Sequence, residues 1–183
     1  MASFDERRLR FNFGDPWRVL KWDREAPYKN VIGKLQHTMA VDFVALNRDE
    51  SSLLLVEVKD FRGHRIENKR RLSNGELRLE VAHKVRDTLA GLIAARRSPI
   101  YSDQVKDFAD ALLSKQRKIH VLLWMEQDLP GPDEEAKTRA SEFALELALV
   151  LRWLNPRVLV ENLRTGSGLP GLNVTSLSRE RNE

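Results

Sequence analysis

Residues 53–65 read Leu-Leu-Leu-Val-Glu-Val-Lys-Asp-Phe-Arg-Gly-His-Arg, and this stretch indicates how the rest of the chain is arranged. Side chains alternate between the two faces of a strand, so Glu57 and Lys59 share a face with Leu53 and Leu55. A buried strand seldom carries ionisable groups without a reason. An apolar strand that contains two charges is therefore a candidate functional site.

A second apolar run, Met-Ala-Val-Asp-Phe-Val-Ala-Leu at 39–46, precedes this strand and contains one acid, Asp42. The polar segment 47–52 between the two runs predicts a turn. So short a connection predicts an antiparallel hairpin. Asp42 then lies near one end of the first strand, where the second strand carries Glu57 and Lys59. We expect the hairpin to bring these three side chains together.

The remaining pattern predicts a mixed α/β sheet with helices on its faces. The segment 118–163 reads as strand, helix and strand, which predicts a parallel crossover. The predicted helices are 81–97, 103–115 and 133–154, and the further strands are 119–125, 157–163 and 172–177. A short extended piece is predicted at 76–80, and residues 17–23 fit either a short strand or one helical turn.

Composition limits the class of protein. The 183 residues fit a single domain, 1–183, in which about the first 15 and the last 10 residues are peripheral. The absence of cysteine excludes disulfides and thiolate zinc sites and fits a cytoplasmic location. No apolar stretch approaches the ~20 residues of a membrane span, so no membrane partner is expected. The sequence leaves a homodimer open.

The ionisable groups of the hairpin suit metal-assisted hydrolysis of phosphodiesters. Magnesium prefers oxygen ligands, which the carboxylates of Asp42 and Glu57 and the backbone carbonyl of Val58 would supply. Lys59 would orient the attacking water or stabilise developing negative charge. The alternative is an Asp–Lys or Glu–Lys ion pair at the end of the sheet, such as Asp42–Lys59, that only neutralises itself. Glu-x-Lys also occurs at 67–69 and 135–137, but only the triplet at 57–59 lies in an apolar strand.

The acid at Asp42, followed after fourteen residues by Glu57-Val58-Lys59, resembles the signature of the PD-(D/E)XK nuclease superfamily, the restriction-endonuclease-like fold. The resemblance covers residues 39–65, and Val41 replaces the proline of the motif. It implies an α-β-β-β-α-β core, a divalent Mg²⁺ or Mn²⁺ cofactor bound by Asp42 and Glu57, and a catalytic Lys59. The implied substrate is nucleic acid, DNA more often than RNA. Inactive members of the superfamily leave a non-catalytic nucleic-acid-binding or protein-interaction module as the alternative.

Basic residues after the hairpin are candidates for nucleic-acid contacts. Arg62, His64 and Arg65 follow the strand directly and suit phosphate binding, although a solvated loop has the same composition. The net charge of +4 mildly favours a polyanionic partner. Aromatic residues between 11 and 22 suit either base stacking or the hydrophobic core. An additional acidic metal ligand is not evident, and the N-terminal candidates are Glu6 and Glu25.

Overall fold

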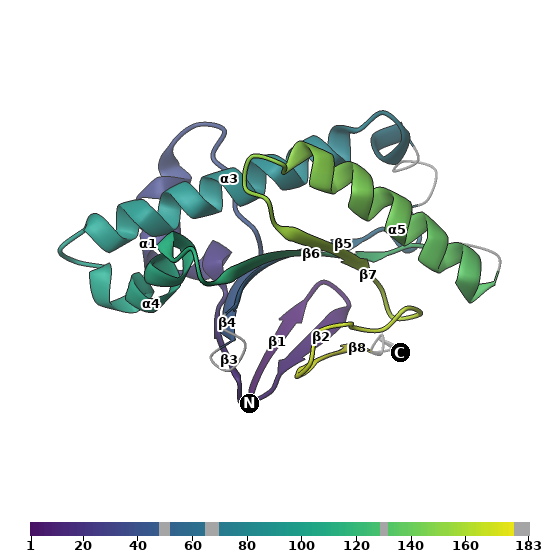
Figure 1. Cartoon of the computed structure of the whole chain (residues 1–183), viewed down its shortest axis with the longest axis horizontal. Helices are drawn as coiled ribbons and strands as arrows, with labels where there is room; N and C mark the ends of the chain where they lie inside the picture. Colours follow the sequence, from purple (N-terminus) through teal and green to yellow (C-terminus); the bar gives the residue numbers. More distant parts are fainter. Residues whose placement is uncertain (48–51, 65–69, 129–131, 178–183) are drawn as a thin grey trace, which may run out of the picture.

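The computed structural model describes residues 1–47, 52–64, 70–128 and 132–177. Figure 1 shows three layers: a five-stranded sheet in the middle, helices over one face, and a small sheet over the other. The helices are α1 (Ala26–Asn30), α3 (Glu76–Arg97), α4 (Ser102–Leu113) and α5 (Asp133–Val150), with 3₁₀ turns η1 (Trp22–Arg24) and η2 (Ile32–Lys34). The strands are β1 (Ala2–Glu6), β2 (Leu9–Phe13), β3 (Trp17–Leu20), β4 (Phe43–Asn47), β5 (Ser52–Asp60), β6 (Lys118–Glu126), β7 (Arg157–Glu161) and β8 (Leu172–Ser176).

The central sheet is mixed, as predicted, with the strand order β3-β4-β5-β6-β7. Strands β3, β4 and β5 are antiparallel neighbours, which confirms the hairpin, although β4 begins four residues later than expected. Strand β6 pairs in parallel with both β5 and β7, so the predicted parallel crossover over 118–163 is confirmed. Residues 17–23 satisfy both alternatives, because β3 is followed directly by η1.

The two faces of β5 enter two different hydrophobic clusters. Leu53 and Leu55 pack under the helices. Leu54, Val56 and Val58 face the small antiparallel sheet, whose strand order is β1-β2-β8. The expectation of helices on both faces is therefore wrong. The second face is covered by strands because the aromatic residues of the N-terminal segment alternate along β2 and present one apolar face.

The N-terminal segment, expected to be peripheral, contributes to the core. Leu9, Phe11 and Phe13 have no exposed surface. The ring centroids of Phe11 and Phe13 lie 5.3 and 6.0 Å from that of Phe43 in β4. Trp22 is also fully buried. Phe11 and Phe13 join the two sheets and Trp22 packs under the helices, so core packing rather than base stacking explains these aromatic residues.

Helix α3 differs most from expectation. The segment 76–80 forms its first turn, so the predicted extended piece is wrong. Gly75 precedes it with a φ of +86°, a conformation that glycine adopts without strain. Leu77, Val81 and Val85 then follow at helical spacing and are buried.

Within the described residues, we find no helix of the length and hydrophobicity that a membrane crossing requires.

Candidate metal-binding site

The hairpin places Asp42 beside Glu57, as predicted. Strand register pairs Phe43 with Val56, so the next step along both strands sets Asp42 opposite Glu57. The Asp42 N–H donates to the Val56 carbonyl at 3.0 Å, and the Val58 N–H donates to Asp42 Oδ2 at 2.7 Å. The Asp42 side chain therefore folds onto the edge of β5, with one carboxylate oxygen held by the backbone.

Glu57 is almost completely buried, with 1 % of its surface exposed. Its Oε1 atom receives the ammonium groups of Lys84 at 2.7 Å and Lys59 at 2.9 Å. Its Oε2 atom is buried and accepts no hydrogen bond from the described residues. Buried polar atoms are normally satisfied, so this oxygen is available to a ligand.

Lys59 lies between two carboxylates. Its Nζ atom is 2.9 Å from Glu57 Oε1 and 2.6 Å from Glu80 Oε1. Burial acts to lower the pKa of Lys59, but Glu57 and Glu80 outweigh it and raise the pKa above its ordinary value. Lys59 therefore stays an ammonium ion. Among the described residues no ion pair joins Asp42 to Lys59, whereas Glu57 and Lys59 do form one, so the alternative of a self-neutralising pair applies to Glu57–Lys59.

Helix α3 supplies two side chains that the sequence did not assign to the site. Glu80 and Lys84 are four residues apart, so they lie on one face of α3. Lys84 binds Glu57, and Glu80 binds both Lys59 and Arg71. Their positions could have indicated this role, because each directly precedes a valine on the buried face of α3. Two charges beside the buried stripe of a helix can face a neighbouring strand.

Asp42 is held in an environment that disfavours its charge. Burial is the largest cause, and Glu57 and Glu6 add repulsion, which together raise the pKa of Asp42 to about 7. Lys84 and the Val58 N–H act in the opposite direction without cancelling the rise. The lysines pair with Glu57 and leave Asp42 with a raised pKa, so a cation beside Asp42 would stabilise its ionised form.

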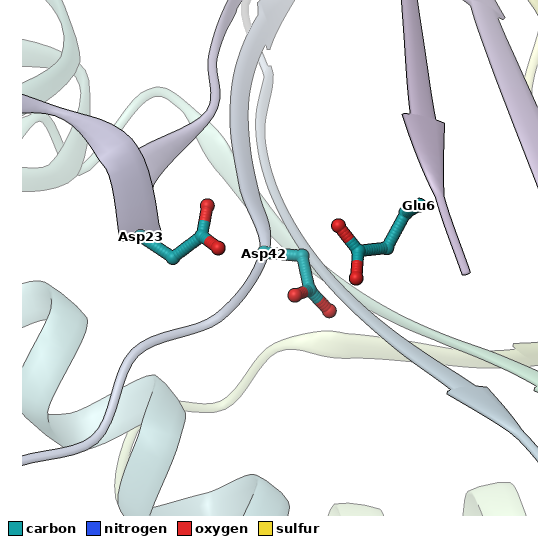
Figure 2. Close-up of side chains that lie close together, drawn as sticks. All are labelled: Glu6, Asp23 and Asp42. Carbon is teal, nitrogen blue, oxygen red and sulfur yellow. The ribbon is translucent and has the colours of Figure 1, made fainter.

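Asp42 also belongs to a second group of acids. Single carboxylate oxygens of Glu6, Asp23 and Asp42 all lie within 4.8 Å of one another (Figure 2). Glu6 ends β1 and Asp23 lies in η1, so the group joins both sheets. Glu57 is not part of this group. The sequence had named Glu6 as a candidate ligand, whereas Asp23 carried no motif and was missed.

Lys21 already places a positive charge in this acidic group. Its ammonium bonds to Glu6 and lies 3.6 Å from Asp23 Oδ1. It also lies 4.4 Å from the centroid of the Phe43 ring. Glu25, the other N-terminal candidate, caps α1 and lies outside the acidic group.

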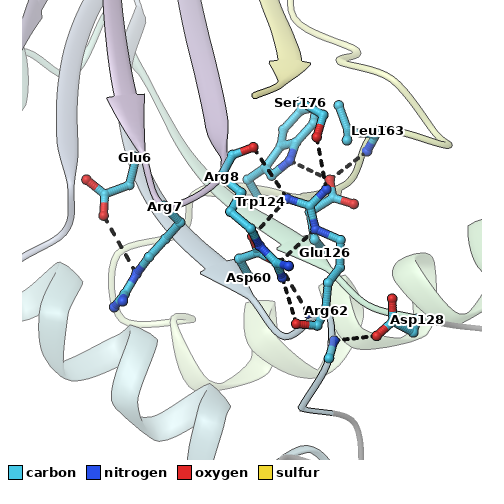
Figure 3. Close-up of polar contacts among 11 residues, drawn as sticks. Glu6, Arg7, Arg8, Asp60, Arg62, Trp124, Glu126, Asp128, Leu163 and Ser176 are labelled. Carbon is cyan, nitrogen blue, oxygen red and sulfur yellow. Dashed lines mark hydrogen bonds and ion pairs between the residues drawn. The ribbon is translucent and has the colours of Figure 1, made fainter. Parts of the chain in front are cut away.

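The residues after β5 have a structural role in addition to any contact with a ligand. The guanidinium groups of Arg8 and Arg62 both bind the Asp60 carboxylate at 2.8–2.9 Å (Figure 3). Burial of Asp60 acts to raise its pKa, but the hydrogen bonds from Arg62 and Arg8 hold it well below the ordinary value. This cluster ties the β1–β2 turn to β5. The predicted phosphate contact Arg62 is therefore already paired.

The other predicted nucleic-acid contacts lie beside this cluster. His64 is exposed and, together with Arg7, Arg8 and Arg62, lines a hollow of about 430 Å³. Arg65 lies outside the described residues.

Comparison of the chain with protein-family models, curated proteins and solved structures found no significant match. The functional assignment therefore depends on the geometry of the residues themselves.

Proposed function

We propose that this protein is a divalent-metal-dependent nuclease that hydrolyses phosphodiester bonds, with DNA as the preferred substrate. One observation carries the proposal: the carboxylate of the half-buried Asp42 lies beside that of the buried Glu57, and the pKa of Asp42 is raised to about 7. A divalent cation at this position would stabilise the ionised form of Asp42 and so offset the burial and the repulsion that raise its pKa.

The available oxygen atoms fit a magnesium or manganese ion. Asp42 Oδ2 is used by the backbone, which leaves Oδ1, and Glu57 offers the unsatisfied Oε2. Backbone groups two residues apart in a strand point to the same edge, so the Val58 carbonyl shares its edge with that of Val56. On that edge the Val56 carbonyl accepts a hydrogen bond from the N–H of Asp42, the residue just before β4. The predicted ligand set of Asp42, Glu57 and the Val58 carbonyl is thus compatible with the geometry.

The role of Lys59 follows from its charge. The bound ion would lower the pKa of a coordinated water and offset charge on the scissile phosphate. A permanently protonated Lys59 is a poor general base. It instead stabilises negative charge that develops on the phosphoryl oxygens and orients the attacking water. Lys84 adds a second ammonium on the same carboxylate.

The order of elements supports the restriction-endonuclease-like core that the resemblance implies. Three successive antiparallel strands, β3, β4 and β5, are followed by a helix, α3, and a strand, β6, parallel to β5. The proposed site lies on the second and third of these strands. A departure is the short helix α1, which follows β3 instead of preceding it.

A non-catalytic binding module remains the second candidate, and one observation favours it. Glu57 Oε1 already binds two lysines, and Lys21 already neutralises part of the acidic group. A site of this kind holds together without a metal ion. On this alternative the protein binds nucleic acid with the usual salt dependence but cuts no substrate.

Metal binding and cleavage measured on matched variants distinguish the two candidates. We expect Mg²⁺ or Mn²⁺ to bind wild type by calorimetry and to support cleavage of double- and single-stranded DNA. Asp42→Asn and Glu57→Gln should lose both properties, and Lys59→Ala should lose cleavage but keep metal binding. Glu135→Gln and Lys137→Ala alter an exposed Glu-x-Lys triplet on α5 and serve as controls. Metal affinity equal in wild type and Asp42→Asn would overturn the proposal.

A further inference from the structure

A large hollow lies at the end of the central sheet opposite the Asp42–Glu57 site. Its volume is about 1020 Å³. The first residues of β5, β6 and β7 form its floor, and the end of α4 and the segment after α5 form its rim. Ser52 at this end and Lys59 at the other are seven residues apart on β5, which corresponds to ~23 Å at about 3.3 Å per residue. The hollow is therefore separate from the proposed metal site.

The hollow is strongly basic. Four of its lining residues carry a permanent positive charge: Lys115, Arg117, Lys118 and Arg157. No aspartate or glutamate occurs among the described residues that line it. Elsewhere the basic side chains near the site are paired, as Arg8, Lys59 and Lys84 are. Positive charge without neighbouring carboxylates attracts an anionic ligand.

Among the described residues, ion pairs do not use these charges. No described carboxylate lies within ion-pair distance of Lys115, Arg117 or Lys118. Arg157 lowers the pKa of the Glu161 carboxyl through a longer-range attraction, against the larger effect of burial, and forms no ion pair with the described residues. Within the described part of the chain, the four side chains therefore have no carboxylate partner.

One further feature of the hollow points to a ligand. Trp153 on the rim is 55 % exposed, an unusual exposure for so large an apolar side chain. An aromatic ring that is open to solvent therefore lies in the same basic hollow.

We propose that this hollow binds a single-stranded stretch of nucleic acid, with phosphates on the four basic side chains and one base stacked on Trp153. Basic grooves with exposed aromatic rings bind single strands in this way, because every base has a stacking face. A paired base in a duplex has both faces covered by its neighbours, which favours the single strand. The identity of the polyanion rests on the proposed function, but the binding itself needs no metal or cleavage.

The test measures binding without cleavage. A fluorescent thymidine dodecamer is titrated with the full-length protein in a chelating buffer, and anisotropy reports the affinity. The variant Lys115→Gln/Arg117→Gln/Lys118→Gln should lose affinity about tenfold or more, and its dependence of log K on log salt should flatten by about 2. Trp153→Ala should weaken binding roughly tenfold with an unchanged salt dependence.

The control removes the same charge elsewhere. Lys29→Gln/Lys34→Gln/Lys106→Gln alters three exposed lysines outside the hollow and should retain most of the affinity. An equal loss in both triple variants would mean non-specific attraction and would overturn the inference. A duplex that binds as tightly as the single strand, or poly-glutamate that competes as well, would also overturn it.

The outcome separates this inference from the proposed nuclease activity. Asp42→Asn is expected to bind the dodecamer as wild type does, because the two sites lie at opposite ends of β5. If Asp42→Asn loses cleavage but binds the dodecamer as wild type does, the metal site supports cleavage and the binding site lies elsewhere. Intact binding in the hollow variants would refute this second site and leave the proposed metal site unaffected.

Discussion

Replacing Asp42 by asparagine should stabilise the protein at neutral pH, although it removes a proposed metal ligand. Burial and the neighbouring Glu57 raise the pKa of Asp42 from 3.8 to about 7. In the unfolded chain the carboxyl ionises at its ordinary pKa, so between these two values the folded state binds more protons than the unfolded state. The free energy of unfolding therefore falls as the pH rises through this window.

The size of the effect follows from the two pKa values. At about 1.36 kcal/mol per pKa unit, the rise corresponds to roughly 4 kcal/mol once Asp42 is fully ionised. Asparagine does not titrate and, like the protonated carboxyl, keeps an oxygen that accepts from the Val58 N–H, whose effect on the ionised form is already part of the pKa. Asp42→Asn should thus be about 4 kcal/mol more stable than wild type at pH 8, and this gain should vanish near pH 4.

Urea unfolding followed by tryptophan fluorescence, in chelating buffer from pH 4 to pH 8, measures the difference. The control Glu142→Gln alters an exposed carboxylate on α5 and should show no comparable pH-dependent gain. Added Mg²⁺ should narrow the gap by stabilising wild type alone. If Asp42→Asn is instead less stable than wild type at pH 8 by several kcal/mol, the carboxylate is a stabilising ion-pair partner and the reasoning fails.

Two further predictions concern the packing that positions the site. Asp60→Asn should cost about 2–4 kcal/mol at pH 7, because Asp60 holds both Arg8 and Arg62. Folding lowers the pKa of Asp60, so the carboxylate contributes to the free energy of unfolding at neutral pH and loses this contribution in acid. In urea unfolding at a series of pH values, the destabilisation by Asp60→Asn should therefore shrink below pH 4, and a destabilisation that is constant with pH would contradict this. Gly91→Val should lower the free energy of unfolding in urea by about 1–3 kcal/mol, because a Cβ at this position would lie only 3.0 Å from the buried Trp22 ring. Unchanged stability would show that the ring moves aside at no cost.

The hairpin illustrates how far local pattern reaches. Apolar alternation in two neighbouring runs and a short polar turn predicted that Asp42 and Glu57 face each other, and strand register bears this out. The same local reading failed at 76–80, where a five-residue window looked extended. The helical spacing of Leu77 with Val81 and Val85 becomes visible only when the window is extended into α3.

Residues that are remote along the chain explain the rest of the site. Glu6 reaches Asp42 because Phe11 and Phe13 pack against Phe43 of β4 and bring the small sheet over the central one. Asp23 reaches it because β3, which ends just before η1, pairs with β4. No spacing rule connects segments that meet through such packing. The same holds for the basic hollow, whose side chains come from the start of three strands and the ends of two helical segments.

The sequence by itself determined strands β4 to β7 of the central sheet, the three long helices and the pair of carboxylates on adjacent strands, because periodicity and turn composition are local properties. Only the tertiary structure decided what surrounds that pair. Burial raises the pKa of Asp42, α3 turns Glu80 and Lys84 toward β5, and Lys59 pairs with Glu57 and Glu80 instead of Asp42. Charge interactions depend on distance and burial in three dimensions, and the order of residues along the chain specifies neither.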